Sequence, residues 1–376
     1  MKIAFEPQIF SSQKYGGIPR YFVELVAQLN KAQDVEAKIL APFYVNDYAK
    51  YLSPSCVQGC HVPLIPKIGT GFCRVTNGMM MPLLMKKLQP DIVHSTYYFP
   101  HIAAPKKAKR VTTVHDMIHE RFSSMIRKGD TTAAWKKKTV LDADHVICVS
   151  ENTRRDLMEL YELHPSKVSV VYHGHNVLNM GVDSAGRASV LNKSLPFLLY
   201  VGARAGYKNF KTFLRAYAGS VWLCENFRII CFGGGRFRAD ELDLIHELGI
   251  KRRQIEQIGG GDDVLAAHYQ NAAAFVYPSL YEGFGIPPLE AMALGCPVIC
   301  SNTSSVPEIV GVAGEYFDPE HIESIRTSVE SVLQSTERRA ELIQNGFKKC
   351  AEYSWERCAS ETLAIYRGIV NRWEHH

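Results

Sequence analysis

The sequence lacks several features that mark special classes of protein. It has no uncharged apolar run of the roughly eighteen residues that a membrane-spanning helix requires. Its ten cysteines are scattered, without the dense framework of a small secreted domain, which favours a reducing compartment. No internal repeat or low-complexity tract is visible. The opening residues 1–5 are too short for a secretory signal and predict a first strand instead, so we expect a cytoplasmic protein.

The composition that remains is that of an ordinary globular chain. Hydrophobic residues make up 46% and charged residues 22% of 376 residues, a length that predicts two domains. The net charge of +5 is uneven, because residues 101–140 hold ten basic and three acidic side chains. This basic segment, 106–138, is either a solvated face or a surface for an anionic membrane or a diphosphate-lipid acceptor. We expect no nucleic-acid partner.

The most informative stretch is residues 278–290. The buried strand predicted at 273–277 runs into a glycine-rich turn, and Pro287 and Pro288 then open a short helix. Glu282 lies in the turn and Glu290 in the helix. Because glycines at a strand-to-helix turn let a ligand approach the backbone, this turn is typical of a phosphate site.

With this spacing of two glutamates, residues 277–307 resemble the retaining glycosyltransferases of family four, which have the GT-B fold. The resemblance implies that Glu290 accepts hydrogen bonds from the nucleotide ribose and that Glu282 contacts the donor sugar. It also implies that the loop amides hold sugar and phosphate; they belong to Gly283, Phe284 and Gly285.

A second glycine turn follows the predicted strand 197–201. Arg204 and Lys208 lie in it, just before a helix, and such cations suit a diphosphate because arginine forks onto oxygens while lysine supplies a point charge. Family-four enzymes are similar here, so the resemblance implies that both residues grip the donor diphosphate. The glycine loops near 233–235 and 259–261 resemble those beside the nucleotide base.

The first half alternates strands and helices, which predicts a parallel sheet. Gly16 and Gly17 precede a predicted helix at 20–30, and the resemblance places such a pair near the donor. His115 ends a predicted strand, and the matching family histidine hydrogen-bonds the donor sugar. Residues 47–76 are predicted to form irregular segments on the surface.

Two patterns raise the question of a metal. The D-x-D of residues 142–144 precedes its strand rather than following it, and the C-x3-C of residues 56–60 lacks further ligands apart from the adjoining His61. We therefore expect no metal and no cofactor.

Together these observations predict two Rossmann-like domains facing across a cleft. Residues 1–178 are expected to form the acceptor-side domain and residues 179–376 the nucleotide-sugar domain, and the family resemblance implies that a final helix from about 355 packs on the first domain. In sequence, the motifs most resemble those of bacterial mannosyltransferases of surface polysaccharide synthesis. This resemblance implies GDP-mannose as donor and a saccharide or lipid-linked saccharide as acceptor. Two alternatives stay open: a retaining glycoside hydrolase using Glu282 and Glu290, and a non-catalytic sugar-nucleotide binder.

Overall fold

The computed structural model describes residues 1–63, 66–98, 104–175, 195–204 and 206–371. The chain forms two compact units. Unit 1 comprises Met1–Gly174 with Ser354–His376, and unit 2 comprises His175–Tyr353. The domain boundary predicted between residues 178 and 179 lies outside the described residues.

Unit 1 contains a seven-stranded parallel sheet with the strand order β3-β2-β1-β4-β5-β6-β7. Its strands are β1 (Lys2–Phe5), β2 (Glu36–Tyr44), β3 (Val57–His61), β4 (Ile92–Ser95), β5 (Lys109–Val114), β6 (His145–Cys148) and β7 (Val168–Val170). Its helices are α1 (Gln8–Ser12), α2 (Gly17–Leu29), α3 (Pro66–Leu88), α4 (Ile118–Arg121), α5 (Thr132–Asp142), α6 (Glu151–Tyr161) and α16 (Trp355–Asn371). Short 3-10 turns are η1 (Ala49–Tyr51), η2 (Ser123–Met125) and η3 (Pro165–Lys167).

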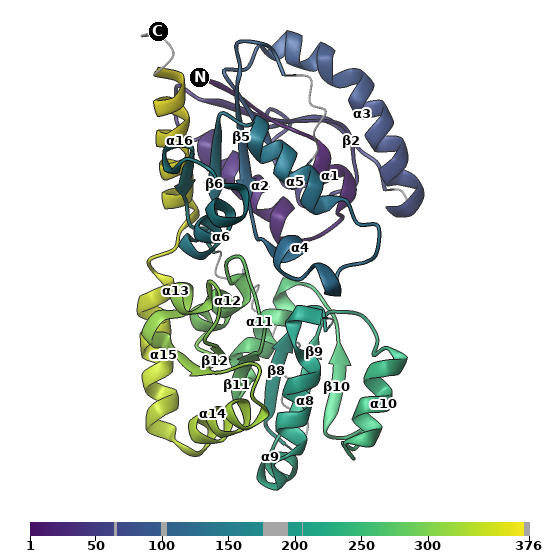
Figure 1. Cartoon of the computed structure of the whole chain (residues 1–376), viewed down its shortest axis with the longest axis vertical. Helices are drawn as coiled ribbons and strands as arrows, with labels where there is room; N and C mark the ends of the chain where they lie inside the picture. The colour runs from purple at the N-terminus through teal and green to yellow at the C-terminus, as the bar shows by residue number, and fades with distance from the viewer. Residues whose placement is uncertain (64–65, 99–103, 176–194, 205, 372–376) are drawn as a thin grey trace. The chain divides into compact units, whose positions relative to one another are not determined.

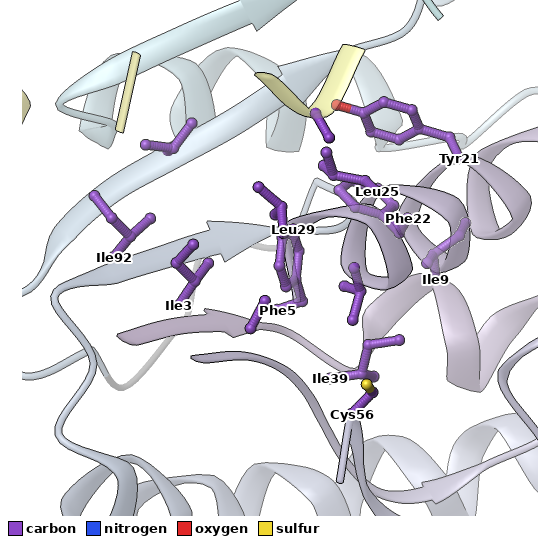
Figure 2. Packing of buried hydrophobic residues seen from close by; sticks show 14 of the residues in the cluster. Ile3, Phe5, Ile9, Tyr21, Phe22, Leu25, Leu29, Ile39, Cys56 and Ile92 are labelled. Atoms are coloured by element: carbon purple, nitrogen blue, oxygen red, sulfur yellow. The ribbon is translucent and has the colours of Figure 1, made fainter. Parts of the chain in front are cut away.

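The core of unit 1 lies between the sheet and helix α2. Phe22, Leu25 and Leu29 recur at helical spacing and are buried against β1, as Figure 2 shows for the labelled side chains. The helix predicted at 20–30 is therefore confirmed, although it begins earlier, at Gly17.

The segment 47–76, expected to be irregular, is partly regular. It contributes β3 and the first half of α3, which packs on β2 (Figure 1). The helix was not predicted because proline and glycine are scattered through this segment and both disfavour a helix interior. Among the described helices, none is long and apolar enough to cross a membrane.

Helix α16 returns to unit 1, as predicted for the final helix, and packs on α2 through buried Trp355 and Tyr366 (Figure 1). The start of this helix passes tightly over Gly174. A Cβ atom on Gly174 would lie 2.3 Å from the backbone nitrogen of Trp355, so no larger residue fits without moving the backbone.

Unit 2 contains a six-stranded parallel sheet with the order β10-β9-β8-β11-β12-β13. Its strands are β8 (Phe197–Val201), β9 (Arg228–Phe232), β10 (Ile255–Ile258), β11 (Ala274–Tyr277), β12 (Val298–Ser301) and β13 (Gly314–Phe317). Its helices are α8 (Phe210–Ala218), α9 (Val221–Asn226), α10 (Ala239–Glu247), α11 (Asp262–Asn271), α12 (Ile286–Ala293), α13 (Val306–Val310), α14 (Ile322–Gln334) and α15 (Thr336–Cys350), with turns η4 (Gly206–Lys208) and η5 (Gly311–Ala313).

Three histidines are buried at the carboxyl end of the unit 1 sheet. His94 Nε2 lies 2.9 Å from Thr113 Oγ1, its Nδ1 bonds Tyr366 on α16, and the rings of His115 and His173 stack at 5.7 Å. Burial lowers the pKa of His94 and of His115 to about 3, and it lowers the pKa of His173 as well. These imidazoles are therefore neutral at pH 7.

This burial predicts acid sensitivity. Histidines of the unfolded chain have a pKa near 6.5, whereas the pKa of His94 and of His115 in the folded protein is about 3. The free energy of unfolding therefore falls as the pH drops from about 6.5 to about 3, because only the unfolded chain takes up these protons. Between pH 7.5 and pH 5.5 each such histidine should lower the free energy of unfolding by about 1 kcal/mol. Urea unfolding of wild type and His115→Asn at both pH values tests this: the variant should lose less stability, and equal losses would contradict the assignment.

Candidate functional site

The strand order of unit 2 brings four loops together. Strand β8 lies between β9 and β11, and β12 follows β11, so the loops at their carboxyl ends are neighbours. The described residues of these loops are 233–238, 202–204 with 206–209, 278–285 and 302–305. The order in which strands are added to the sheet reverses between β8 and β11, and open parallel sheets bind ligands at such a switch point.

Lys208 and Glu282 meet across this switch point. Lys208 Nζ donates to Glu282 Oε1 at 2.6 Å, and the side chains are 18% and 11% exposed. The backbone N–H of Leu280 also donates to the Tyr207 carbonyl at 2.7 Å, which ties the two loops together. The structure therefore brings together two residues, 74 positions apart, that the sequence assigned to one donor site.

Side chains of the 302–305 loop hold the Glu282 backbone. The Ser304 hydroxyl accepts from the Glu282 N–H at 2.9 Å, and the Ser305 hydroxyl donates to the carbonyls of Glu282 and Phe284 at 2.9 and 2.7 Å. Ser304 adopts a left-handed backbone (φ 55°), an uncommon conformation for a residue other than glycine. The loop around Glu282 is thus fixed from its back.

Arg204 is more deeply buried than a ligand-gripping cation would suggest. Its side chain is 1% exposed, and its guanidinium donates to the carbonyls of Gly233 (3.0 Å), Gly235 (2.8 Å) and Arg236 (2.9 Å) and to Glu241 (3.3 Å). In this structure Arg204 orders the glycine turn after β9. A direct contact with the donor diphosphate stays a prediction.

The turn that Arg204 orders requires glycine. Gly233, Gly234 and Gly235 all have left-handed φ values between 68° and 78°. A Cβ on Gly234 would lie 2.6 Å from the Gly202 carbonyl oxygen and 2.8 Å from Arg204 Nη1. The close approach of this turn to the β8 loop therefore depends on the missing side chain.

Glu290 lies in helix α12, which begins at Ile286 and ends before Gly295, as predicted. Its side chain is largely buried, and the Tyr269 hydroxyl donates to Oε2 at a long 3.5 Å. Burial raises the pKa of Tyr269 well above its usual value, and the neighbouring carboxylate adds to the effect. Tyr269 therefore stays a neutral donor to Glu290.

The other predicted site residues, His115, Gly16 and Gly17, belong to unit 1. His115 follows β5 and is stacked with His173, and its Nε2 is buried without a hydrogen-bond partner. Gly16 and Gly17 form the start of α2. An unsatisfied buried ring nitrogen is costly in a protein interior and marks His115 as a group that a ligand could satisfy.

The basic segment needs a correction. Lys136 is fully buried and pairs with Glu120 at 2.8 Å, so it belongs to the interior and not to a surface. Lys109 pairs with Asp144, and Arg121 pairs with Asp156 and Glu159. The exposed basic residues are Lys106, Lys107, Arg121, Arg127, Lys128, Lys137 and Lys138.

Residues of the two sequence patterns that raised the question of a metal contact other protein groups. Asp144 accepts from the Arg110 N–H at 2.8 Å, and His61 lies 3.3 Å from Asp47. Within the described part of the chain, no three His, Cys, Asp or Glu side chains gather as metal ligands. Whether the protein works without a metal stays a prediction.

Comparison with known families decides the class. Residues 15–177 match the family model described as Glycosyltransferase Family 4, and residues 183–349 match Glycosyl transferases group 1. The chain belongs to the group 1/family 4 glycosyltransferases. This membership confirms the resemblance seen in the sequence.

Individual relatives agree with this assignment. The O-antigen chain mannosyltransferase B of Escherichia coli is 29% identical over 72% of this chain and 74% of its own length. Sucrose-phosphate synthase from Thermosynechococcus elongatus superimposes with a TM-score of 0.78 at 20% identity, over 99% of both chains. Anabaena HepE, in complex with UDP and glucose, gives 0.73 at 16% identity, over 97% of this chain and 99% of its own. The fold of this glycosyltransferase is therefore GT-B, as predicted.

Some residues of the glycosyltransferase site escaped the sequence reading. Ser304 and Ser305 sit in a Ser/Thr-rich turn before α13, a composition that signals backbone hydrogen bonding. Glu241 gave a different signal: it stands three residues after Arg238, where a capping-box glutamate would stand, and it accepts from the Arg238 N–H at 2.8 Å.

We expect the fold of unit 2 to depend on Glu241. Its side chain is fully buried against Arg204, so Glu241→Ala leaves an unpaired buried cation and should cost roughly 3–5 kcal/mol in unfolding free energy. The exposed neighbour Asp240, which pairs with Arg238 and Lys211, is the matched control. Urea denaturation should show a much larger loss for Glu241→Ala than for Asp240→Ala. Equal losses would mean that the buried pair does not stabilise the unit.

Proposed function

We propose that this glycosyltransferase moves a mannosyl residue from GDP-mannose to a hydroxyl of a saccharide or lipid-linked saccharide, with retention of anomeric configuration, in cell-surface polysaccharide synthesis. O-antigen, capsule and exopolysaccharide are the expected product classes. The observation that carries the transfer chemistry is the Lys208–Glu282 pair at the switch point of unit 2. Its relatives include O-antigen chain mannosyltransferase B, which favours mannose as the transferred sugar.

In the proposed reaction, the bond from the sugar anomeric carbon to the diphosphate oxygen breaks and a bond to the acceptor oxygen forms. The acceptor hydroxyl passes its proton to the departing diphosphate oxygen as this bond forms. Negative charge develops on the leaving diphosphate, where Lys208 and Arg204 would stabilise it. Glu282 would stabilise the positive charge on the sugar, while Glu290 would accept from the ribose hydroxyls. Gly16, Gly17 and His115 would complete the donor site.

This scheme needs no metal, because the cations of the β8 loop already offset the diphosphate charge. The enzyme would act in the cytoplasm at the inner face of the membrane, where a lipid-linked acceptor is accessible. All ten cysteines lie within the described residues and are free thiols, which supports a reducing compartment. The basic residues exposed between 106 and 138 favour an anionic surface.

The hydrolase alternative loses its support. Both halves of the chain match glycosyltransferase families, and Glu282 is paired with a lysine. A hydrolase has no diphosphate for Lys208 to meet. No feature of the site favours a binder without activity.

A thermal-shift screen tests the donor. GDP, UDP and ADP, each alone and with its sugar, are compared on the same protein with and without EDTA. GDP-mannose at a hundred times its Kd should add about 2.7 kcal/mol of stability. Stabilisation by UDP-glucose alone would overturn GDP-mannose as the donor, since HepE holds UDP and glucose.

Metal independence is tested by measuring the transfer rate in EDTA, where transfer should persist. Loss of transfer in EDTA that magnesium restores would overturn metal independence.

The two glutamates should separate in their effects. Glu290→Gln loses a carboxylate that accepts from vicinal ribose hydroxyls, so GDP binding should weaken by about 1–3 kcal/mol. Glu282→Gln keeps a partner for Lys208 and should spare GDP affinity, but it should lower turnover because its charge acts in the transition state. Calorimetry with GDP beside transfer rates measures both.

Lys208→Ala is the companion variant, since it removes the cation from the same pair. It should lower turnover at saturating donor by roughly ten- to a thousandfold. Weakened GDP binding in Glu282→Gln together with normal binding in Glu290→Gln would reverse the assigned pocket. Normal turnover in Lys208→Ala would remove this lysine from the mechanism.

A further inference from the structure

Helix α3 of unit 1 is apolar on its outer face as well as on its buried one. Met81, Met85 and Leu88 point inward and pack on the sheet. On the opposite face Val75, Met79 and Leu83 recur every four residues and are 59%, 75% and 71% exposed. In a globular protein, contiguous exposed apolar side chains of this kind mark a surface that contacts something.

The position of α3 is fixed on its inner side. Asn77 Oδ1 accepts from the Phe43 N–H at 2.8 Å, and Asn77 Nδ2 donates to the Phe43 carbonyl at 2.8 Å and to Ser11 Oγ at 2.9 Å. The helix therefore cannot rotate to bury its outer stripe without breaking this buried network. The exposed stripe is a stable feature of the surface.

The segment that carries this stripe has charged side chains of one sign. No Asp or Glu occurs between Asp47 and Asp91. Lys86 and Lys87 are exposed in the last turn of the helix. Arg74, which precedes Val75 in the helix, lies 5.2 Å from the Trp135 ring of α5. That contact joins α3 to the helix that carries the exposed Lys137 and Lys138.

We propose that the outer face of α3, formed by Val75, Met79 and Leu83 with Lys86 and Lys87, inserts into the interface of an anionic lipid bilayer. The apolar side chains enter the acyl boundary and the lysines meet lipid phosphates, the two signals that stable peripheral binding requires. The inference deepens the proposed function, which places a lipid-linked acceptor at the membrane, by naming the surface that contacts the lipid.

The charges favour lipid over a second copy of the chain. A two-fold interface sets the same patch against itself, so lysines without neighbouring carboxylates would face lysines. An anionic bilayer instead supplies negative charge to every lysine at once. Methionine and leucine side chains are flexible enough to fit a fluid surface.

The test is co-sedimentation of the full chain with vesicles of phosphatidylcholine, alone or mixed with phosphatidylglycerol. The stripe variant, Val75→Ser, Met79→Gln and Leu83→Gln, should bind mixed vesicles at least about tenfold more weakly. The matched control is Val221→Ser, Leu242→Gln and Val312→Ser in unit 2, where the exposed fractions are 73%, 52% and 77%. This control should bind like wild type.

The charge variant, Lys86→Gln and Lys87→Gln, should lose about tenfold in binding to mixed vesicles and little to neutral ones. Wild-type binding by the stripe variant, an equal loss in the unit 2 control, or no binding of the wild type to mixed vesicles would each overturn the proposal. So would sedimentation equilibrium showing a wild-type dimer that the stripe variant dissociates.

Failure here is distinguishable from failure of the proposed function. Transfer to a water-soluble acceptor should be unchanged in the stripe variant, and vesicle binding should be unchanged in Lys208→Ala. Intact transfer with no vesicle binding would overturn only the lipid surface, whereas vesicle binding without any transfer would overturn only the donor chemistry.

Discussion

The Lys208–Glu282 ion pair depends on one constraint, the adjacency of β8 and β11 in a parallel sheet. The chain reaches β11 only after making β9 and β10 on the other side of β8. That reversal leaves the β8 and β11 loops side by side with no helix between them. A cation from one loop therefore meets a carboxylate from the other at 2.6 Å. Any change that separates β8 from β11 would break the Lys208–Glu282 pair as well as the sheet.

Unit 1 repeats the reversal but uses it differently. Strand β1 lies between β2 and β4, and aromatic and imidazole rings gather at the carboxyl end of this sheet. Tyr21 from α2 contacts both His115 and His173, and Trp355 from α16 contacts His173. Because burial keeps these histidines neutral, their rings offer hydrogen bonding without a charge of their own. Neutral rings suit sugar hydroxyls better than phosphates.

The sequence predicted those features that follow from local rules. Pro287 at a helix start and Gly295 after its end marked α12, and the glutamate spacing marked the donor loop. Helix α3 was missed because it contains Gly71, Gly78 and Pro82, residues that disfavour a helix, and its packing on the sheet offsets their cost. Lys136 was assigned to a surface because sequence shows charge but not its partner. Arg204 was recognised as important, yet its carbonyl contacts depend on three left-handed glycines that only the fold brings near.

The contacts of Glu282 divide into two independent sets. Ser304 and Ser305 hold its backbone, whereas Lys208 holds its carboxylate. In the proposed reaction a bound diphosphate would compete with Glu282 for Lys208, since both are anions within reach of one ammonium group. When Lys208 leaves Glu282 for the diphosphate, the Glu282 carboxylate would lose its ion-pair partner. Its Cα would stay in place, because Ser304 and Ser305 hold the loop. The carboxylate would then act on the sugar only while the diphosphate is bound, so substrate binding itself would complete the site.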